Sequence, residues 1–194
     1  MPRRGQAAKV LDTALRLFDL QGYSATTVED IKLQSQVSVG SIYHHFGNKE
    51  GIAGALYVES LSDFRRGLAD AIGKAGAEQG VRAGVSHHLS WCEANRARAR
   101  FLMRRRETEV ADVTRDAVDS LNRRTFQTID LWYQPLVAAG EIRELPLPLL
   151  YSVWFGPAQE YARAVLEHGL SKSLLDLPGA EPALADAAWA ALRP

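Results

Sequence analysis

Residues 26–49, TTVEDIKLQSQVSVGSIYHHFGNK, constrain the fold of this chain more than any other segment. Their apolar and turn-forming residues predict two short helices joined by a tight turn. Thr26 and Glu29 have the spacing of a capping box at the start of the first helix, and Ser38 is placed to cap the second. The major groove of DNA is wide enough to admit a helix that is presented in this way. The segment therefore predicts an element that reads DNA.

Helical periodicity surrounds this segment on both sides. After it, Asn48 is placed to cap a longer helix whose apolar stripe runs to Ile72. Before it, apolar residues recur with the spacing of one helix face until Gly22, a residue suited to ending a helix. These residues are Val10, Leu11, Ala14, Leu17 and Phe18. Further helices are expected at 81–94, 96–106, 110–139, 147–168 and 181–192. Neither the alternation nor the hairpin signals typical of strands occur.

We therefore expect an all-α chain with two parts. Residues 1–50 would form a three-helix helix-turn-helix domain, which at this size is too small to hold a large core. Residues 51–194 would form a C-terminal helical bundle for effector binding and dimerisation. The helix over residues 51–72 would join the two parts as a connector, because its apolar stripe continues without a flexible linker.

The bulk composition is that of an ordinary globular protein. The 23 Lys and Arg residues balance 23 Asp and Glu residues, so affinity for DNA would have to come from geometry and dimerisation. Cys92 is the single cysteine, which is typical of a reducing compartment. No stretch approaches the roughly 20 apolar residues of a membrane span, and the N-terminus does not lead into the apolar run of a signal peptide. We expect a cytoplasmic protein without membrane contact.

Three stretches within residues 6–56 resemble the DNA-binding domain of the TetR/AcrR family of bacterial helix-turn-helix transcriptional regulators. They are LFDLQGY, TTVEDI and VSVGSIYHHFGNKEGI. The rest of the chain shares only the helical pattern and the length of such regulators. The resemblance implies a homodimeric repressor that binds a palindromic operator in double-stranded DNA. It also implies release by a small-molecule effector and a dimer formed by the last two helices.

Two residues depart from the family pattern. Gln36 stands in the turn where the family usually has glycine, and Lys32 stands where a small residue is usual. If the turn requires positive φ, Gln36 carries a backbone strain of about 1 kcal/mol. Neither change removes a DNA contact, so we expect them to affect only the fine geometry of the turn.

The resemblance and the side-chain chemistry together assign DNA contacts to eight residues: Thr27, Ser38, Val39, Gly40, Ser41, Tyr43, His44 and Lys49. Four of them form the first turn of the recognition helix. There, hydroxyls can bond base edges, a valine can contact a thymine methyl, and glycine permits close approach. The phenol, the imidazole and the ammonium would donate to phosphates, as would Thr27 at the start of its helix. Arg3 and Arg4 would follow the DNA as a disordered arm.

Other interpretations of these residues remain open. Tyr43 is also compatible with a core position, although two other residues of its helix already fill the inward stripe. His44 and His45 suggest a metal pair, but adjacent residues on a helix point about 100° apart, which disfavours a shared ion. Lys49, taken alone, is also compatible with a solvated charge.

The C-terminal part is rich in aromatic residues at helical positions, and a packed core explains any single one of them. Some of them are also candidates to line a cavity for a bulky hydrophobic effector. The candidate set is His88, Trp91, Cys92, Met103, Phe126, Ile129, Trp132 and Tyr133. We interpret the basic run from Arg96 to Arg106 as a solvated helix surface. Its alternatives are an anchor for an anionic effector and a contact with the first domain.

The last two helices favour a dimer interface. The segment 147–168 is unusually apolar for a terminal helix, and the final helix adds a face of small and apolar residues around Ala188. Two such helices from each of two subunits would form a four-helix interface. A hydrophobic core buried within one subunit is the alternative.

The favoured function is a ligand-responsive transcriptional repressor, with no catalytic residue, metal or cofactor. An enzyme would need a nucleophile beside a base, and only His88 and Cys92, one helical turn apart, offer such a pair. A helical adaptor that binds only protein would leave the exposed pattern of residues 38–44 unexplained. Either alternative would use a pocket near Trp91 and Cys92. Salt-sensitive binding to duplex DNA separates the repressor from both.

Overall fold

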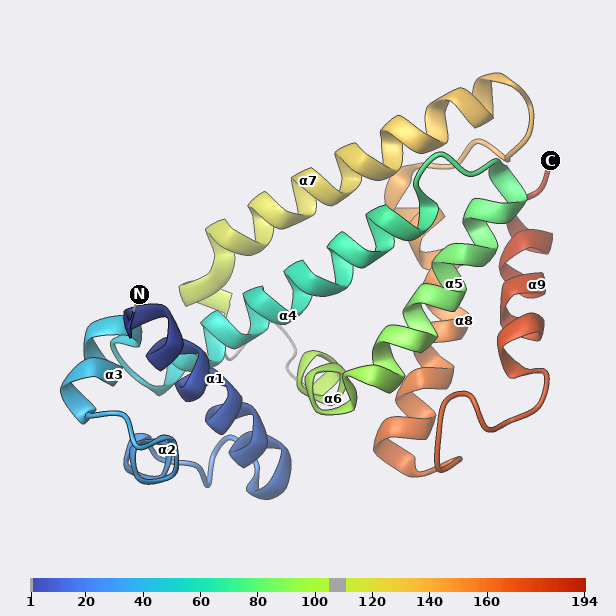
Figure 1. Cartoon of the computed structure of the whole chain (residues 1–194). Helices are drawn as coiled ribbons and strands as arrows, with labels where there is room; N and C mark the ends of the chain where they lie inside the picture. The colour runs from blue at the N-terminus through green and yellow to red at the C-terminus, as the bar shows by residue number, and fades with distance from the viewer. Residues whose placement is uncertain (1, 105–110) are drawn as a thin grey trace. The chain divides into compact units, whose positions relative to one another are not determined.

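The computed structural model describes residues 2–104 and 111–194 of the chain (Figure 1). Within these residues all regular backbone is helical, which confirms the predicted fold class. The helices are α1 (Pro2–Gln21), α2 (Val28–Ser35), α3 (Val39–Phe46), α4 (Lys49–Ile72), α5 (Ala77–Ala94), α6 (Arg96–Arg104), α7 (Ala111–Ala138), α8 (Leu147–His168) and α9 (Ala180–Leu192).

The described residues group into two compact units. The first is drawn from Met1–Leu61 and Ala97–Val118, and the second from Ser62–Arg96 and Asp119–Pro194. This division differs from the boundary expected after residue 50. The beginning of α4 and nearly all of α6 belong with the helix-turn-helix, because their apolar residues complete its small core.

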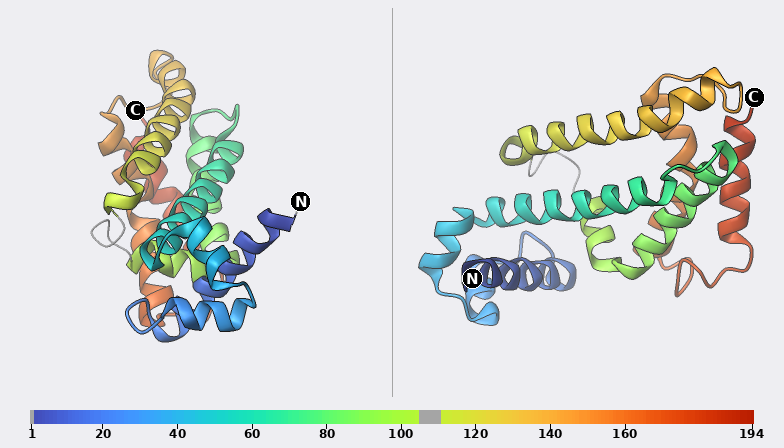
Figure 2. Two further views of the ribbon diagram at one scale, coloured as in Figure 1. Left: turned by 90° about the vertical axis from the view of Figure 1, so that its left-hand side faces the viewer. Right: turned by 45° about the horizontal axis from the view of Figure 1, so that its top comes forward.

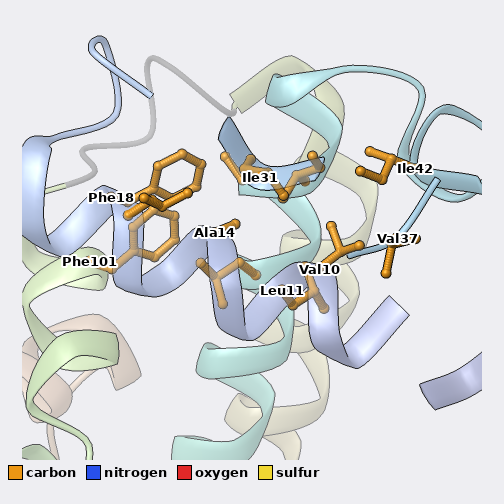
Figure 3. Close-up of a cluster of buried hydrophobic side chains, with 12 residues drawn as sticks. Val10, Leu11, Ala14, Phe18, Ile31, Val37, Ile42 and Phe101 are labelled. Atoms are coloured by element: carbon orange, nitrogen blue, oxygen red, sulfur yellow. The ribbon is translucent and has the colours of Figure 1, made fainter. Parts of the chain in front are cut away.

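Apolar side chains from α1, α2, α3, α4 and α6 form the core of the first unit (Figure 3). Ile31 of α2 and Ile42 of α3 close onto the inner face of α1 and are 0% and 1% exposed. Phe101 of α6 stacks on Phe18 of α1, with ring centroids 5.9 Å apart and planes 11° from parallel. Such an aromatic pair stabilises the contact beyond the area that it buries. The first unit is therefore built from residues far apart in the sequence.

The capping box of α2 lies one residue later than predicted. Thr27 Oγ1 accepts a hydrogen bond from the Asp30 N–H (3.1 Å), and an Asp30 carboxylate oxygen accepts one from the Thr27 N–H (2.9 Å). Thr26 is fully buried, and its hydroxyl donates to the Gly22 carbonyl at 2.8 Å. The predicted pair of Thr26 and Glu29 is wrong. Both pairs have the same spacing, and the burial of Thr26 selects between them.

The turn between α2 and α3 has the strained backbone that its glutamine suggested. Gln36 lies in the left-handed region, with φ 57° and ψ 27°, and it is the one non-glycine residue of positive φ in the described parts of the chain. Its N–H donates to the Lys32 carbonyl at 3.0 Å. Ser38 caps α3 as predicted, since its hydroxyl oxygen accepts from the Ser41 N–H at 3.3 Å.

Helices α5, α8 and α9 pack against one another in the second unit (Figures 1 and 2). Glycines of α5 let two indoles lie directly on its backbone: a Cβ at Gly80 would be 2.4 Å from Trp132, and one at Gly84 would be 2.6 Å from Trp154. Both indole N–H groups donate to backbone carbonyls at 2.8 Å. The sequence suggested a break in the helical pattern over residues 73–80, but Gly80, which lies under an indole, is part of a helix. Consequently α5 begins at Ala77 and not near residue 81.

Replacing Gln36 by glycine is expected to raise the free energy of unfolding of the first unit by about 0.5–1 kcal/mol, because glycine adopts positive φ without a Cβ clash. Chemical denaturation followed by far-UV circular dichroism measures the change. Gln36→Ala is the matched control, since it keeps the Cβ and should show no such gain. Equal stability of the glycine and alanine variants would contradict the strain.

Candidate nucleic-acid interface

One face of α3 carries exposed groups that follow one another along the helix. Val39 is 41% exposed and Tyr43 is 51% exposed, and Gly40 and His44 beside them are exposed as well. These positions, i, i+1, i+4 and i+5, share one side of a helix. The opposite side buries Ile42. The exposed face therefore offers a small apolar group, bare backbone, a phenol and an imidazole, and Tyr43 is not a core residue.

The hydroxyls assigned to DNA contacts also hold the local structure. Ser41 Oγ donates to Gln6 Oε1 of α1 at 3.1 Å, and Thr27 Oγ1 donates to an Asp30 carboxylate oxygen at 2.7 Å. A hydroxyl has a single proton to donate, so these two groups retain only acceptor capacity for a partner. Ser38 uses its oxygen as the cap of α3, which leaves its proton as a donor. Sequence reasoning missed Gln6, for which no spacing rule gave a signal.

Lys49 has a structural role that neither earlier interpretation described. Its ammonium donates to the carbonyls of Tyr23 at 2.9 Å and Thr26 at 2.8 Å, and it lies 4.2 Å from the centroid of the Tyr23 ring. An ammonium has three protons, so at most one remains for a phosphate. Lys49 therefore ties the loop between α1 and α2 to the start of α4.

Arg3 and Arg4 belong to a helix and not to an arm. Helix α1 begins at Pro2, so the expectation of disordered backbone at these two residues is wrong. Proline at the first position of a helix has its φ already set for the helix and lacks the N–H that would have no helical acceptor. The sequence PRRG therefore starts α1 directly.

The basic segment of α6 binds carboxylates of the first unit. Arg100 makes two charge-assisted hydrogen bonds to Asp19 of α1, at 2.7 and 2.6 Å, and Arg98 pairs with Glu59 of α4 at 2.9 Å. The Arg100 and Asp19 side chains are only 21% and 20% exposed. The hydrogen bonds from Arg100 hold the pKa of the Asp19 carboxyl below its usual value. The solvated-surface interpretation is thus wrong for Arg98 and Arg100, and contact with the first domain is correct.

The place of α6 in the DNA-reading unit was missed by sequence reasoning. Phe101, an aromatic residue within a basic run, was the available signal for a buried face. No pattern in the sequence links Asp19 to a residue 81 positions away. Arg105 and Arg106, the end of the basic run, lie outside the described residues.

Most residues expected to line an effector cavity are packed in the core of the second unit. His88, Trp91, Cys92, Ile129, Trp132 and Tyr133 are all buried. The Trp91 indole donates to an Asp63 carboxylate oxygen at 2.9 Å. Phe126 is half-buried, and Met103 lies on α6 in the first unit. The structure therefore does not bring the whole candidate set together.

His88 and Cys92 do not have the chemistry of a nucleophile and its base. The Cys92 sulfur lies 3.9 Å from His88 Nε2. Burial raises the pKa of the Cys92 thiol to about 12 and lowers the pKa of His88 to about 4. Both groups are therefore neutral near pH 7, whereas nucleophilic attack needs a thiolate.

Among the described residues, no group of three or more His, Cys, Asp or Glu side chains is arranged to hold a metal ion. The rings of His44 and His45 meet edge to face, with centroids 5.4 Å apart. In the same parts of the chain, no helix combines the length and the apolar character of a bilayer span.

A short capped helix that exposes one face beyond a tight turn defines a helix-turn-helix DNA-binding domain. Residues 10–56 match the family model of bacterial regulatory proteins of the tetR family. Residues 10–56 therefore form a DNA-binding domain of the TetR type. The matched family model and relatives describe transcription regulators, and they give no support to the enzyme alternative.

Named relatives match the chain over a short stretch. The chain is 41% identical over 44 residues to the HTH-type negative transcriptional regulator IcaR of the biofilm operon icaADBC in Staphylococcus epidermidis, a match to 23% of this chain and 24% of IcaR. It is 38% identical over 61 residues to the HTH-type transcriptional repressor KstR2 of Rhodococcus jostii, a match to 31% of this chain and 30% of KstR2. The chain thus spans about a quarter to a third of the length of these relatives.

Solved structures share the fold over nearly the whole chain. A TetR-family transcription regulator from Marinobacter aquaeolei is similar with a TM-score of 0.80 and 18% identity, covering 100% of this chain and 99% of that one. The regulator FadR of Bacillus subtilis, solved with stearoyl-CoA, has a TM-score of 0.75 and 22% identity and covers 93% and 96% of the two chains. At such low identity, the likeness establishes the fold alone.

Asp19→Asn is expected to lower the free energy of unfolding of the first unit by about 1–3 kcal/mol at neutral pH, because it breaks a partly buried charge-assisted pair. The matched control is Asp12→Asn. The Asp12 side chain is 74% exposed, and its carboxylate lies 4.0 Å from Arg98, so this change should have little effect.

The same pair predicts a pH dependence. Since the pKa of Asp19 is lowered in the folded state, the stability from the pair is present above the unfolded pKa, near 4, and is lost as pH falls through the folded value. In urea denaturation at a series of pH values, the difference between wild type and Asp19→Asn should shrink below about pH 4. A difference that does not change with pH would contradict the ion pair.

Proposed function

We propose that this protein is a homodimeric transcriptional repressor that binds a palindromic operator in double-stranded DNA and is released by a small-molecule effector. The observation that carries the proposal is the exposed face of α3, formed by Val39, Gly40, Tyr43 and His44 on a helix that a capped turn presents. The names of the matched relatives IcaR and KstR2, a negative regulator and a repressor, support the repressor reading. A protein that binds DNA would act in the cytoplasm.

The DNA contacts follow from the chemistry of that face. Val39 would contact a thymine methyl, and the exposed backbone at Gly40 would allow close approach to the bases. Tyr43 and His44 would donate to phosphates, together with backbone N–H groups at the start of α2. Lys49 would offer its one remaining proton to a phosphate or act only through the loop that it holds. Base contacts would determine which DNA sequence is bound. Phosphate contacts would fix the position of the protein along the duplex.

A homodimer supplies the affinity that one nearly uncharged unit lacks. Its proposed interface is the outward face of α8 and α9. On α8, Leu149 is 48% exposed, and Val153 and Gly156 follow it on the same side of the helix. On α9, small residues recur at i, i+4 and i+7 and are exposed: Ala183, Ala187 and Ala190. Small side chains permit two helices to approach closely, so a four-helix interface fits this face.

In a dimer, the two recognition helices would enter successive major grooves, roughly 34–36 Å apart. An effector would favour a conformation with a different separation, with a coupling of typically about 1–3 kcal/mol. Helices α4 and α6 are the proposed links, since each has residues in both units. The Arg100–Asp19 pair would make the first unit respond to a movement of α6.

The DNA-reading face is tested by selecting bound duplexes from a random pool and then measuring fluorescence anisotropy on the selected operator. Tyr43→Ala should weaken binding about tenfold on all bound sequences, because a phosphate contact carries no base information. Val39→Ala should instead relax the preference at one A·T position. Leu131→Ala, at a residue of α7 that is 80% exposed, is the control for a surface change elsewhere. If no duplex is enriched, or if the Tyr43 and Leu131 variants behave alike, the repressor proposal fails.

The dimer face is tested with Gly156→Arg. A Cβ at Gly156 meets no atom within 4 Å, so the subunit should fold normally, while a long charged side chain would keep α8 from its symmetry mate. Sedimentation velocity should show monomers, and operator binding should fall at least tenfold, because two half-sites are then bound independently. Leu131→Arg is the matched control and should stay dimeric. If the Gly156→Arg protein is still dimeric, the proposed interface is wrong and the dimer forms through another face.

A further inference from the structure

A side-chain hydrogen bond joins the first helix to the recognition helix at the edge of the DNA-reading face. Ser41 Oγ of α3 donates to Gln6 Oε1 of α1 at 3.1 Å. Gln6 is exposed and Ser41 is half-buried, so the bond lies at the surface of the first unit. Gln6 precedes residues 10–56, which match the family model. The bond is therefore a feature of this chain that the matched motif does not include.

The packing of α1 against α3 holds the two partners of this bond in place. Gln6 and Val10 are four residues apart and share one face of α1. Val10 is fully buried and belongs to the same core cluster as Ile42 of α3 (Figure 3). Ser41 directly precedes Ile42 in the chain. Gln6 thus lies one helical turn before the buried contact between the two helices, where that contact reaches solvent.

Ser41 borders the exposed face of α3. It is three residues before His44, so the two are neighbours on the helix surface, and His44 is exposed. The buried Ile42 lies about 100° away from Ser41 around the helix axis. Ser41 also belongs to the first turn of the recognition helix, the part of such a helix that meets base edges in the major groove. Its hydroxyl is therefore placed to contact a base.

The bond to Gln6 decides which hydrogen-bonding role Ser41 keeps. A serine hydroxyl has one proton and two acceptor lone pairs, and a serine without a partner can pair with donors or acceptors of the bases. Because the proton of Ser41 is directed to Gln6, its oxygen is left as an acceptor. In the major groove, adenine N6 and cytosine N4 carry donor amino groups, whereas thymine O4 and guanine O6 are acceptors. A fixed acceptor therefore distinguishes bases that a freely rotating hydroxyl would not.

We propose that Gln6 is a positioning residue for sequence recognition, which fixes the Ser41 hydroxyl as an acceptor. Ser41 then prefers adenine or cytosine at one position of the strand that it faces. It disfavours thymine or guanine there, because their oxygens would meet its own lone pairs. Gln6 acts through Ser41 and not through a base contact of its own. The proposal rests on the proposed DNA-binding function and adds a residue of α1 that sets the base preference.

The test measures the affinity of the full-length protein for four duplexes by fluorescence anisotropy. Each duplex is the operator selected from the random pool, with a different base at the position read by Ser41 in one half-site. That position is identified as the one at which Ser41→Ala removes the preference. Wild type should bind the adenine and cytosine duplexes about three- to tenfold more tightly than the other two, the range expected from one hydrogen bond.

Variants of Gln6 separate the role of its oxygen from that of its bulk. Gln6→Leu removes the acceptor and nearly keeps the volume, so the Ser41 hydroxyl rotates freely and the four duplexes should bind within about twofold of one another. Gln6→Glu keeps an acceptor oxygen and should keep the preference, with weaker binding to all four because it adds a negative charge near the phosphates. Gln6→Leu combined with Ser41→Ala should show the base preference of Ser41→Ala alone.

The matched control is Gln34→Leu. Gln34 of α2 is also exposed, and its Oε1 accepts a hydrogen bond from another helix, from Arg16 Nη2 of α1 at 2.7 Å. Neither of these residues belongs to α3, so the loss of this bond should leave the base preference unchanged. Thermal melting verifies that each variant is folded.

The proposed role of Gln6 is overturned if Ser41→Ala removes no base preference or if Gln6→Leu keeps the preference of wild type. It is also overturned if Gln6→Leu weakens all four duplexes equally, as a purely structural change would, or if Gln34→Leu causes the same shift. These outcomes leave the repressor proposal intact, because each of them requires specific binding to the operator. If no duplex is enriched from the pool, the repressor proposal fails and the role of Gln6 fails with it.

Discussion

The stability of the first unit depends on apolar residues that come from outside the helix-turn-helix. Three short helices bury too little to be stable alone, so the core takes Ile52 and Leu56 from α4 and Phe101 from α6. Once Phe101 stacks on Phe18, Arg100 and Asp19 are brought into the partly buried pair that closes this contact. The recognition helix is therefore supported by residues that the chain supplies long after the helix-turn-helix is complete.

The DNA-reading face is small, and its hydroxyl and ammonium groups are mostly used within the chain. Ser41 is bonded to Gln6, Thr27 to Asp30, and Lys49 to two loop carbonyls. The Ser41–Gln6 bond ties α3 to α1, and the exposed side of α3 is left for the proposed base contacts. A face with so few free charges would gain affinity from shape and from duplication in the proposed dimer, which is consistent with the zero net charge of the chain.

Packing accounts for the large aromatic residues of the second unit. Its indoles lie on glycine backbone and donate to carbonyls, so they act as core residues. The aromatic-rich sequence therefore suggested a hydrophobic effector, whereas the structure uses most of these aromatic side chains in its core.

The sequence by itself determined the helices, the cap at Ser38, the strained turn at Gln36 and the family of the N-terminal domain, because periodicity and turn chemistry are local properties. It misplaced the capping box of α2, since Thr26 and Thr27 are locally equivalent and only burial distinguishes them. Only the tertiary structure decided that α6 joins the DNA-reading unit and that Gly80 continues a helix. These features depend on contacts between residues such as Asp19 and Arg100, 81 positions apart, and no local pattern records which distant side chain will fill or neutralise a site.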